Sequence, residues 1–221
     1  MEELFSALQS PPLAKRPWVT LSYAQSLDGC IAPLSRQPLM ISGKESLVLT
    51  HRLRAAHQAI LVGIGTVLSD DPRLTVRLAP GTHPQPVILD SFLRVPLNCK
   101  LLTQSRPWLI TTEQADIIRR EQLRDMGAQV IVANRNGHGQ VDLADALQQM
   151  ARRGVRSVMV EGGSTVLTSF LQSGLIDHLV VTVAPLVLGG LRAVNALSTP
   201  LPLQSPHWER FGNDWVFWGR V

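Results

Sequence analysis

The feature that most constrains the fold is a regular alternation of short apolar segments with segments of helical spacing. Such an alternation favours a largely parallel sheet covered by helices on both faces. The expected fold class is therefore α/β, with three layers and a mostly parallel central sheet. The predicted strands are 59–62, 86–90, 108–111, 129–132, 157–160 and 178–183, and the predicted helices are 44–57, 113–126, 142–153 and 164–172.

The two ends of the chain differ from this alternating pattern. Residues 1–16 contain a double proline and are expected to form a leader, so the domain proper is assigned to 17–221 and begins with a strand at 18–23. The last apolar segment, 214–218, follows a proline-rich loop with no helix before it. We expect it to add an antiparallel strand at the edge of the sheet.

The composition of the chain argues against several classes of function and location. The net charge of +4 comes from dispersed basic residues, which disfavours nucleic-acid binding and suits ligands that carry phosphates. Charged residues make up only 17% of the chain, so part of the surface is expected to be a subunit interface. Cys30 and Cys99 lie far apart, and no apolar run has the length of a membrane span. These observations predict a cytoplasmic protein without a disulfide framework, a metal site or a membrane segment.

The segment Val158–Leu167 combines an apolar strand, the acid Glu161, the pair Gly162–Gly163 and the start of a helix. A helix N-terminus exposes free N–H groups, and glycines let an anion approach the backbone. Phosphate binding is one interpretation, and a tight strand-to-helix turn is the other. Glu161 favours a ligand site, because ligands of open α/β sheets bind at the carboxyl ends of the strands.

A second strand, 59–62, runs into Gly63 and Gly65. The third glycine of a dinucleotide-binding fingerprint is missing, because Leu68 stands in its place. Taken alone, both glycines are more typical of a turn, and Asp70–Asp71–Pro72 is more typical of a helix end than of a binding site.

Arginines flank this second turn at Arg54, Arg73 and Arg77. The arginine fork matches phosphate bidentately, although a single arginine is usually a solvated surface residue. His51 and His57 lie six residues apart on the predicted helix and are interpreted as ordinary helix residues. The chain has no GxxxxGK[ST], no GxSxG and no HxE paired with PCxxC, which argues against P-loop, serine-hydrolase and zinc-deaminase chemistry.

Taken together and in order, the motifs resemble the reductase domain of riboflavin biosynthesis. This domain occurs as the C-terminal half of a bifunctional deaminase-reductase and as a free-standing enzyme. The resemblance covers nearly the whole chain from about Trp18 onward. It rests on Ala24–Ala32 (AQSLDGCIA), His51–Ala55 (HRLRA), Ala59–Gly63 (AILVG), Thr66–Arg77 (TVLSDDPRLTVR), Ile88–Ser91 (ILDS), Val160–Gly163 (VEGG) and Ala184–Gly190 (APLVLGG).

The resemblance implies a dihydrofolate-reductase-like fold, NADPH as the cofactor, a homodimer, and reduction of a ribosylamino pyrimidine 5′-phosphate to its ribitylamino form. Together with the glycine turns, it assigns cofactor binding to Ala24, Gly63, Thr66, Asp70, Ser91, Gly162, Gly163, Ser164, Thr165, Val166 and Leu167. The substrate-binding residues are Arg54, Leu74, Arg77 and Glu161. Candidates for an acid–base group are Asp28, Asp70 and Glu161, although Asp28 is equally suited to cap the turn into Gly29.

One segment departs from the family pattern. Where the family has Ser-X-Trp, this chain has Pro38 and Met40 at the serine and tryptophan places, so a hydroxyl and a flat aromatic wall are missing. Two alternatives therefore stay open. One is a reductase of the same fold that acts on a pterin or another small heterocycle, and the other is a non-catalytic NADPH-binding module.

Overall fold

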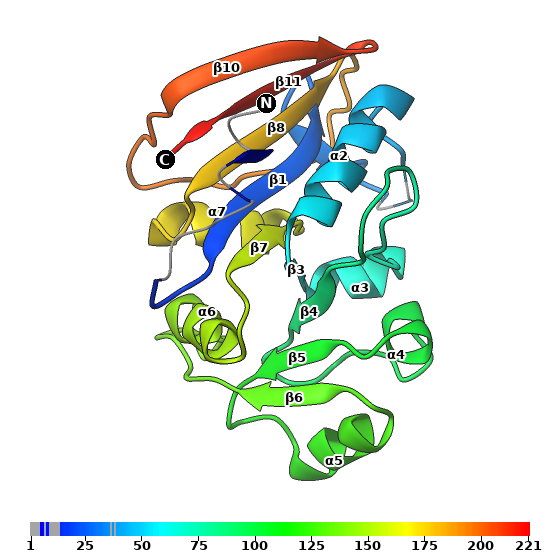
Figure 1. The fold of residues 1–221 in the computed structure, drawn as a ribbon, viewed down its shortest axis with the longest axis vertical. Helices are drawn as coiled ribbons and strands as arrows, with labels where there is room; N and C mark the ends of the chain where they lie inside the picture. The colour runs from blue at the N-terminus through cyan, green and yellow to red at the C-terminus, as the bar shows by residue number, and fades with distance from the viewer. Residues whose placement is uncertain (1–4, 7, 9–13, 36, 38) are drawn as a thin grey trace.

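The computed structural model describes residues 5, 6, 8, 14–35, 37 and 39–221, and within them the principal sheet has nine strands (Figure 1). Their order is β10-β11-β8-β1-β7-β3-β4-β5-β6. The parallel strands are β1 (Trp18–Ser26), β3 (Ala59–Gly63), β4 (Gln85–Leu89), β5 (Trp108–Thr111), β6 (Gln129–Val132), β7 (Ser157–Val160) and β8 (His178–Ala184). The prediction of a mostly parallel sheet is confirmed, and the carboxyl ends of these strands share one edge.

The antiparallel end of the sheet differs from the prediction in one respect. β11 (Asp214–Arg220) does pair antiparallel with β8, but β10 (Gln204–Phe211) pairs on its far side and is the true edge strand. The segment expected to be a loop thus forms a strand. It returns into β11 through Gly212, whose φ of 64° lies in the left-handed region that tight hairpin turns require.

Helices cover both faces of the sheet, as predicted. They are α2 (Lys44–Ala56), α3 (Ile64–Asp70), α4 (Lys100–Gln104), α5 (Ile117–Asp125), α6 (Leu143–Arg152) and α7 (Ser164–Ser173). Figure 1 shows α6 and α7 on one side of the sheet and α2, α3 and α4 on the other.

Side-chain alternation along the central strands explains this layering. In β3, Ala59 and Leu61 share a buried cluster with residues of α6 and α7, whereas Ile60 and Val62 share one with residues of α3 and α4. The third cluster joins α2 to the antiparallel end, where Leu53 belongs with Val180 and Trp218. Each central strand is therefore buried on both faces, which its continuous apolar sequence requires.

Capping residues determine where several helices begin. α5 starts at Ile117 rather than at the predicted Glu113, because the Asp116 side chain accepts a hydrogen bond from the Arg119 N–H. α6 starts after Asp142 in the same way. Gly127 and Gly154 follow the ends of these helices with φ of 90° and 88°, as predicted for C-terminal caps.

Smaller elements complete the domain. β2 (Cys30–Ala32) pairs with β9 (Leu191–Arg192) in a separate two-stranded sheet that was not predicted. Of the short helices, α4 was not predicted, whereas the interpretation of Asp70–Asp71–Pro72 as a helix end is confirmed by the end of α3. The described part of the leader contacts the domain, because Leu8 is buried in the cluster that contains Leu53. None of the helices in the described ranges has the length and apolar character needed to cross a membrane.

Candidate active site

The two glycine turns of the sequence lie side by side at the carboxyl edge of the sheet. β3 and β7 are neighbouring parallel strands, and each runs directly into a helix, α3 or α7. The Gly163 N–H donates a hydrogen bond to the Thr66 hydroxyl oxygen at 3.1 Å, which joins the two turns. Two predicted cofactor residues that are far apart in the sequence are thus in direct contact.

Packing explains why glycine occupies these turns. A Cβ added at Gly63 would lie 2.6 Å from Val166 Cγ2, and one added at Gly162 would lie 2.8 Å from Val166 Cβ. The absence of side chains lets the first turn of α7 sit close against β3 and β7. Gly65 is different, because an added Cβ there meets nothing within 4 Å. The packing role of Gly63 is therefore established by the geometry, whereas its cofactor contact stays a prediction.

The start of α7 suits an anion. Gly163 is the N-cap and has no side chain that could accept a hydrogen bond, so it leaves the first-turn N–H groups of α7 without a side-chain cap. Ser164 is half-buried and Thr165 is exposed, whereas the Leu167 side chain is fully buried and could reach a ligand only through its backbone. A backbone cradle of this kind fits a phosphate group of a dinucleotide cofactor.

Arg54 and Glu161 form a bidentate ion pair on the α2 side of the sheet. Arg54 Nε donates to Glu161 Oε1 at 2.7 Å, and Nη2 donates to Oε2 at 2.6 Å. Nη1 donates to the carbonyl oxygen of Thr75 at 3.1 Å. The side chains are only 13% and 18% exposed. Burial lowers the pKa of Arg54, but the charge and the hydrogen bonds of Glu161 together raise it by more, so the pKa of Arg54 lies above its ordinary value. Each of the three guanidinium nitrogens of Arg54 therefore already donates a hydrogen bond within the protein.

The segment 71–84, between α3 and β4, carries the other two predicted substrate residues. Leu74 is buried with a φ of 54°, a left-handed conformation that is uncommon for leucine. Arg77 is exposed and donates from Nη1 to the Thr75 hydroxyl at 2.7 Å. Arg73 is also exposed, and the pKa of Arg77 is lowered by burial first and then by the charges of Arg54 and Arg73. This segment presents a cationic surface beside the Arg54–Glu161 pair.

His51 is a buried residue of this region that the sequence analysis interpreted as an ordinary helix residue. It is 1% exposed, and its Nδ1 accepts the N–H of Arg77 at 2.9 Å. Burial, followed by the charges of Arg54 and Arg77, lowers its pKa to about 4, against the opposing effect of Glu161. The ring is therefore neutral at pH 7. Helical spacing from Arg54 was the available signal, because residues three apart share a helix face.

Asp28 serves a structural network. Its carboxylate accepts hydrogen bonds from the Ser26 hydroxyl at 2.5 Å, the Leu188 N–H at 2.9 Å and the Gly189 N–H at 2.7 Å. These donors, the Ser26 hydroxyl first, hold the pKa of Asp28 well below its ordinary range. The network explains why the motifs 24–32 and 184–190 occur together, because backbone N–H groups of the second motif donate hydrogen bonds to the Asp28 carboxylate of the first.

The three remaining residues predicted to bind the cofactor, Ala24, Asp70 and Ser91, lie on three different elements or loops. Ala24 lies on β1 opposite Thr182, and the exposed Asp70 is the last residue of α3. Ser91 follows β4, and its hydroxyl oxygen accepts the N–H of Val141 at 3.0 Å. The preceding Asp90 was not predicted. It is fully buried, accepts the Val95 N–H at 2.9 Å, and has its pKa raised by burial.

Of the departing positions, Met40 is 74% exposed, whereas Pro38 lies outside the described residues. Within the ranges that the structure describes, no group of His, Cys, Asp or Glu side chains is arranged to hold a metal ion.

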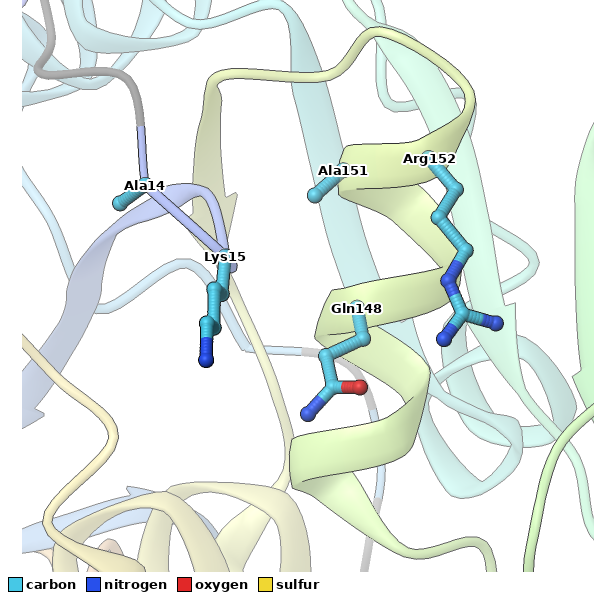
Figure 2. A pocket seen from close by; sticks show the side chains of 5 residues that line it. All are labelled: Ala14, Lys15, Gln148, Ala151 and Arg152. Carbon is cyan, nitrogen blue, oxygen red and sulfur yellow. The ribbon is translucent and has the colours of Figure 1, made fainter.

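A hollow of about 360 Å³ lies away from this edge (Figure 2). Its lining residues are Ala14, Lys15, Gln148, Ala151 and Arg152. Figure 2 shows Gln148 reaching from α6 toward the side of Lys15. The end of α6 and the residues before β1 both lie at the amino ends of the strands, opposite to the glycine turns, so we separate this hollow from the candidate active site.

Known proteins resemble the chain over nearly its full length. The sequence profile of the RibD C-terminal domain matches residues 17–217. The 2,5-diamino-6-ribosylamino-4(3H)-pyrimidinone 5′-phosphate reductase of Archaeoglobus fulgidus is 40% identical over 187 residues, covering 79% of this chain and 83% of that protein. The riboflavin biosynthesis protein RibD of Aquifex aeolicus is 37% identical over 210 residues, covering 91% of this chain but only 57% of that protein.

The fold comparison agrees. The solved structure of the Saccharomyces riboflavin biosynthesis reductase Rib7 has a TM-score of 0.82 and 27% identity, with 99% of this chain and 96% of that chain covered. The α/β fold implied by the resemblance is confirmed by this similarity and by the observed sheet. The chain belongs to the RibD C-terminal domain family.

Proposed function

We propose that the protein is an NADPH-dependent reductase of riboflavin biosynthesis that converts the ribosylamino group of a pyrimidine 5′-phosphate to a ribitylamino group. One observation carries the proposal beyond family membership. Glu161, in the predicted substrate site, directly precedes the Gly162–Gly163 turn, which contacts Thr66 at the predicted cofactor site. Cofactor and substrate would therefore meet at the carboxyl end of β7.

The cofactor side would be formed by backbone groups. The uncapped start of α7 would hold a cofactor phosphate, and Thr66 would keep the two turns together. When bound, NADPH supplies the hydride that reduces C1 of the ring-opened sugar imine. The remaining predicted contacts on this side are Ala24, Asp70 and Ser91. The task of the protein is to align the two ligands and to exclude water.

On the substrate side, we assign the ribose 5-phosphate to Arg77. Its guanidinium is exposed and, among the described residues, donates a hydrogen bond only to the Thr75 hydroxyl, whereas the donors of Arg54 point to Glu161 and to the Thr75 carbonyl oxygen. Arg54 would then act by holding Glu161 in place for the sugar or the ring. Leu74, buried and locally strained, would fix the course of the segment that carries Arg77.

The three candidate acid–base groups differ in their surroundings. Asp28 accepts three hydrogen bonds that favour its ionised form, which makes it a poor proton donor. Both carboxyl oxygens of Glu161 already accept hydrogen bonds from Arg54. Asp70 is the exposed last residue of α3, and among the described residues its carboxyl group is committed to no hydrogen bond, so we favour it. The kcat of the reductase assay should fall in Asp70→Asn and stay near the wild-type value in Asp28→Asn.

We further propose a homodimer in the cytoplasm. β10 and β11 present a sheet face on which Trp208, Trp215 and Phe217 are 63%, 45% and 39% exposed, and strand register places these aromatic rings on one side. A patch of this kind suits a subunit contact. Light scattering should give twice the chain mass for the protein and a single chain mass for Trp208→Glu.

The decisive assay measures oxidation of NADPH with the amino-oxo and the diamino form of the pyrimidine ribosyl phosphate. We expect turnover with at least one form and much slower turnover with NADH. Dihydrofolate serves as the comparison substrate for a pterin reductase. Turnover with dihydrofolate alone would favour that alternative, and tight NADPH binding without turnover on any pyrimidine would favour a non-catalytic module.

A further inference from the structure

The segment 71–84 carries Leu74 and Arg77 but forms neither helix nor strand. Leu74 has a φ of 54°, and a non-glycine residue keeps such a conformation only where its surroundings impose it. The site therefore needs a specific means of holding this segment.

Consecutive backbone groups of the segment are held by side chains. The Thr75 carbonyl oxygen accepts from Arg54 Nη1 at 3.1 Å, and the Arg77 N–H donates to His51 Nδ1 at 2.9 Å. Between them, the Val76 N–H donates to His83 Nδ1 at the longer distance of 3.3 Å. Arg54 and His51 both belong to α2, so one helix provides two of these three hydrogen bonds to the backbone of the segment.

The imidazole of His51 is suited to this contact. Nδ1 must be unprotonated to accept the Arg77 N–H, and the ring is 1% exposed. The groups that act on it electrostatically are the cations of Arg54 and Arg77, which favour the neutral ring, and the carboxylate of Glu161, which opposes them. Burial first, and then the charges of Arg54 and Arg77, therefore keep Nδ1 of His51 unprotonated and able to accept the Arg77 N–H.

We propose that His51 is a positioning residue for the substrate phosphate: by accepting the Arg77 N–H, it sets the backbone from which the Arg77 guanidinium reaches the phosphate. This inference rests on the proposed function, which gives Arg77 its substrate role. His51 touches neither substrate nor cofactor in this account and acts only through Arg77.

His57 provides a matched control on the same helix. It is also buried, and its pKa is also lowered to about 4, with burial as the main cause. Its contacts, however, are to the Leu53 carbonyl oxygen at 2.7 Å and to the Thr20 hydroxyl at 2.8 Å. Removing His57 should therefore affect the core and leave segment 71–84 in place.

The test compares His51→Leu, His51→Asn and His57→Leu by the KM for each substrate, by kcat and by the melting temperature. His51→Leu should raise the KM for the pyrimidine phosphate roughly two- to tenfold, the usual effect of one lost hydrogen bond, and leave the KM for NADPH unchanged. Asparagine can place an oxygen near the position of Nδ1, so His51→Asn should recover most of the loss. His57→Leu should lower the melting temperature without changing either KM.

The decisive result is the double variant. In an Arg77→Ala background, His51→Leu should cause no further rise in the KM, because both changes remove the same phosphate contact. An additive rise, a parallel rise in both KM values, or no recovery by asparagine would overturn the proposal. If His51→Leu does not fold, His51→Gln provides the same comparison, because its longer side chain displaces the acceptor.

A readout independent of turnover separates this proposal from the proposed function. Calorimetric titration with ribose 5-phosphate measures the phosphate contact directly. Weaker binding by His51→Leu and Arg77→Ala, but not by His57→Leu, would support the role of His51 even if the wild-type protein reduced no pyrimidine. Equal binding by wild type and His51→Leu would contradict it even if the reductase assay succeeded.

Discussion

The cofactor side and the substrate side of the candidate site are built in different ways. The cofactor side consists of glycines and backbone N–H groups at the start of α7, where the absence of a side chain is what the packing requires. The substrate side consists of charged side chains from α2, β7 and segment 71–84 that are already bonded to one another. On the cofactor side, we expect an added side chain to be harmful, because it would fill the space that the packing needs. On the substrate side, we expect the loss of one side chain to be harmful, because its partners lose their hydrogen bonds.

The largest expected effect is on the substrate side. Arg54→Ala leaves Glu161 charged and largely buried without its partner, which should lower the free energy of unfolding by about 3 kcal/mol. The double variant Arg54→Met with Glu161→Met should regain most of this stability while pyrimidine reduction stays lost. Denaturant titration and the NADPH assay measure the two effects. Equal stability of wild type and Arg54→Ala would show that the pair contributes nothing to the fold.

Arg77→Ala tests the phosphate assignment. Loss of a charge-assisted contact of about 1.5–3 kcal/mol should raise the KM for the pyrimidine phosphate roughly ten- to a hundredfold, with little change in the KM for NADPH. Arg153→Ala, at the end of α6 by the opposite edge, is the charge-matched control and should leave both values unchanged. An unaltered KM in Arg77→Ala would remove Arg77 from the substrate site.

The cofactor side is tested by a pair of glycines two residues apart. Gly63→Ala places a Cβ against Val166 and should lower stability by about 1–3 kcal/mol and weaken NADPH binding. Gly65→Ala meets no neighbour within 4 Å and lies within α3, so it should raise stability by about 0.5–1 kcal/mol. Thermal unfolding and NADPH fluorescence quenching measure both. The same effect from the two substitutions would refute the packing argument.

The smallest effect concerns pH. His51 and His57 have folded-state pKa values lowered to about 4, whereas the unfolded chain binds these protons near 6.5. Stability is therefore full above about pH 6.5 and is lost as the pH falls toward 4. Between pH 7 and 6, each histidine should cost less than about 1 kcal/mol. In urea titrations, the free energy of unfolding of His57→Leu should fall less steeply with decreasing pH than that of the wild type. The same pH dependence in both proteins would contradict the lowered pKa of His57.

Periodicity and spacing predicted the layers, the parallel sheet and the C-terminal glycine caps of α5 and α6, because these depend on local pattern. β10 was missed because Pro206 is typical of a loop, although an edge strand tolerates proline where no ladder donor is needed. The two-residue β9 is too short to produce a pattern of its own.

The residues of the candidate site were predicted better than the hydrogen-bond and ion-pair partners of those residues. Arg54 and Glu161 were both expected to contact substrate, but a pairing between residues 107 positions apart is visible only in the fold. His51 carried a helical spacing and no other signal, because its partner is a backbone N–H that no motif marks. For Asp28, the motif 184–190 was recognised in the sequence, but the hydrogen bonds that the Leu188 and Gly189 N–H groups donate to the carboxylate are visible only in the fold.

Isotope transfer tests the central claim most directly. The pyrimidine ribosyl phosphate would be reduced with NADPH carrying deuterium at both C4 positions, and the product examined by mass spectrometry and NMR. We expect one deuterium per product molecule, located at C1 of the ribityl chain. A product without deuterium at that carbon, or no product from either pyrimidine form, would refute direct hydride transfer from NADPH to the sugar.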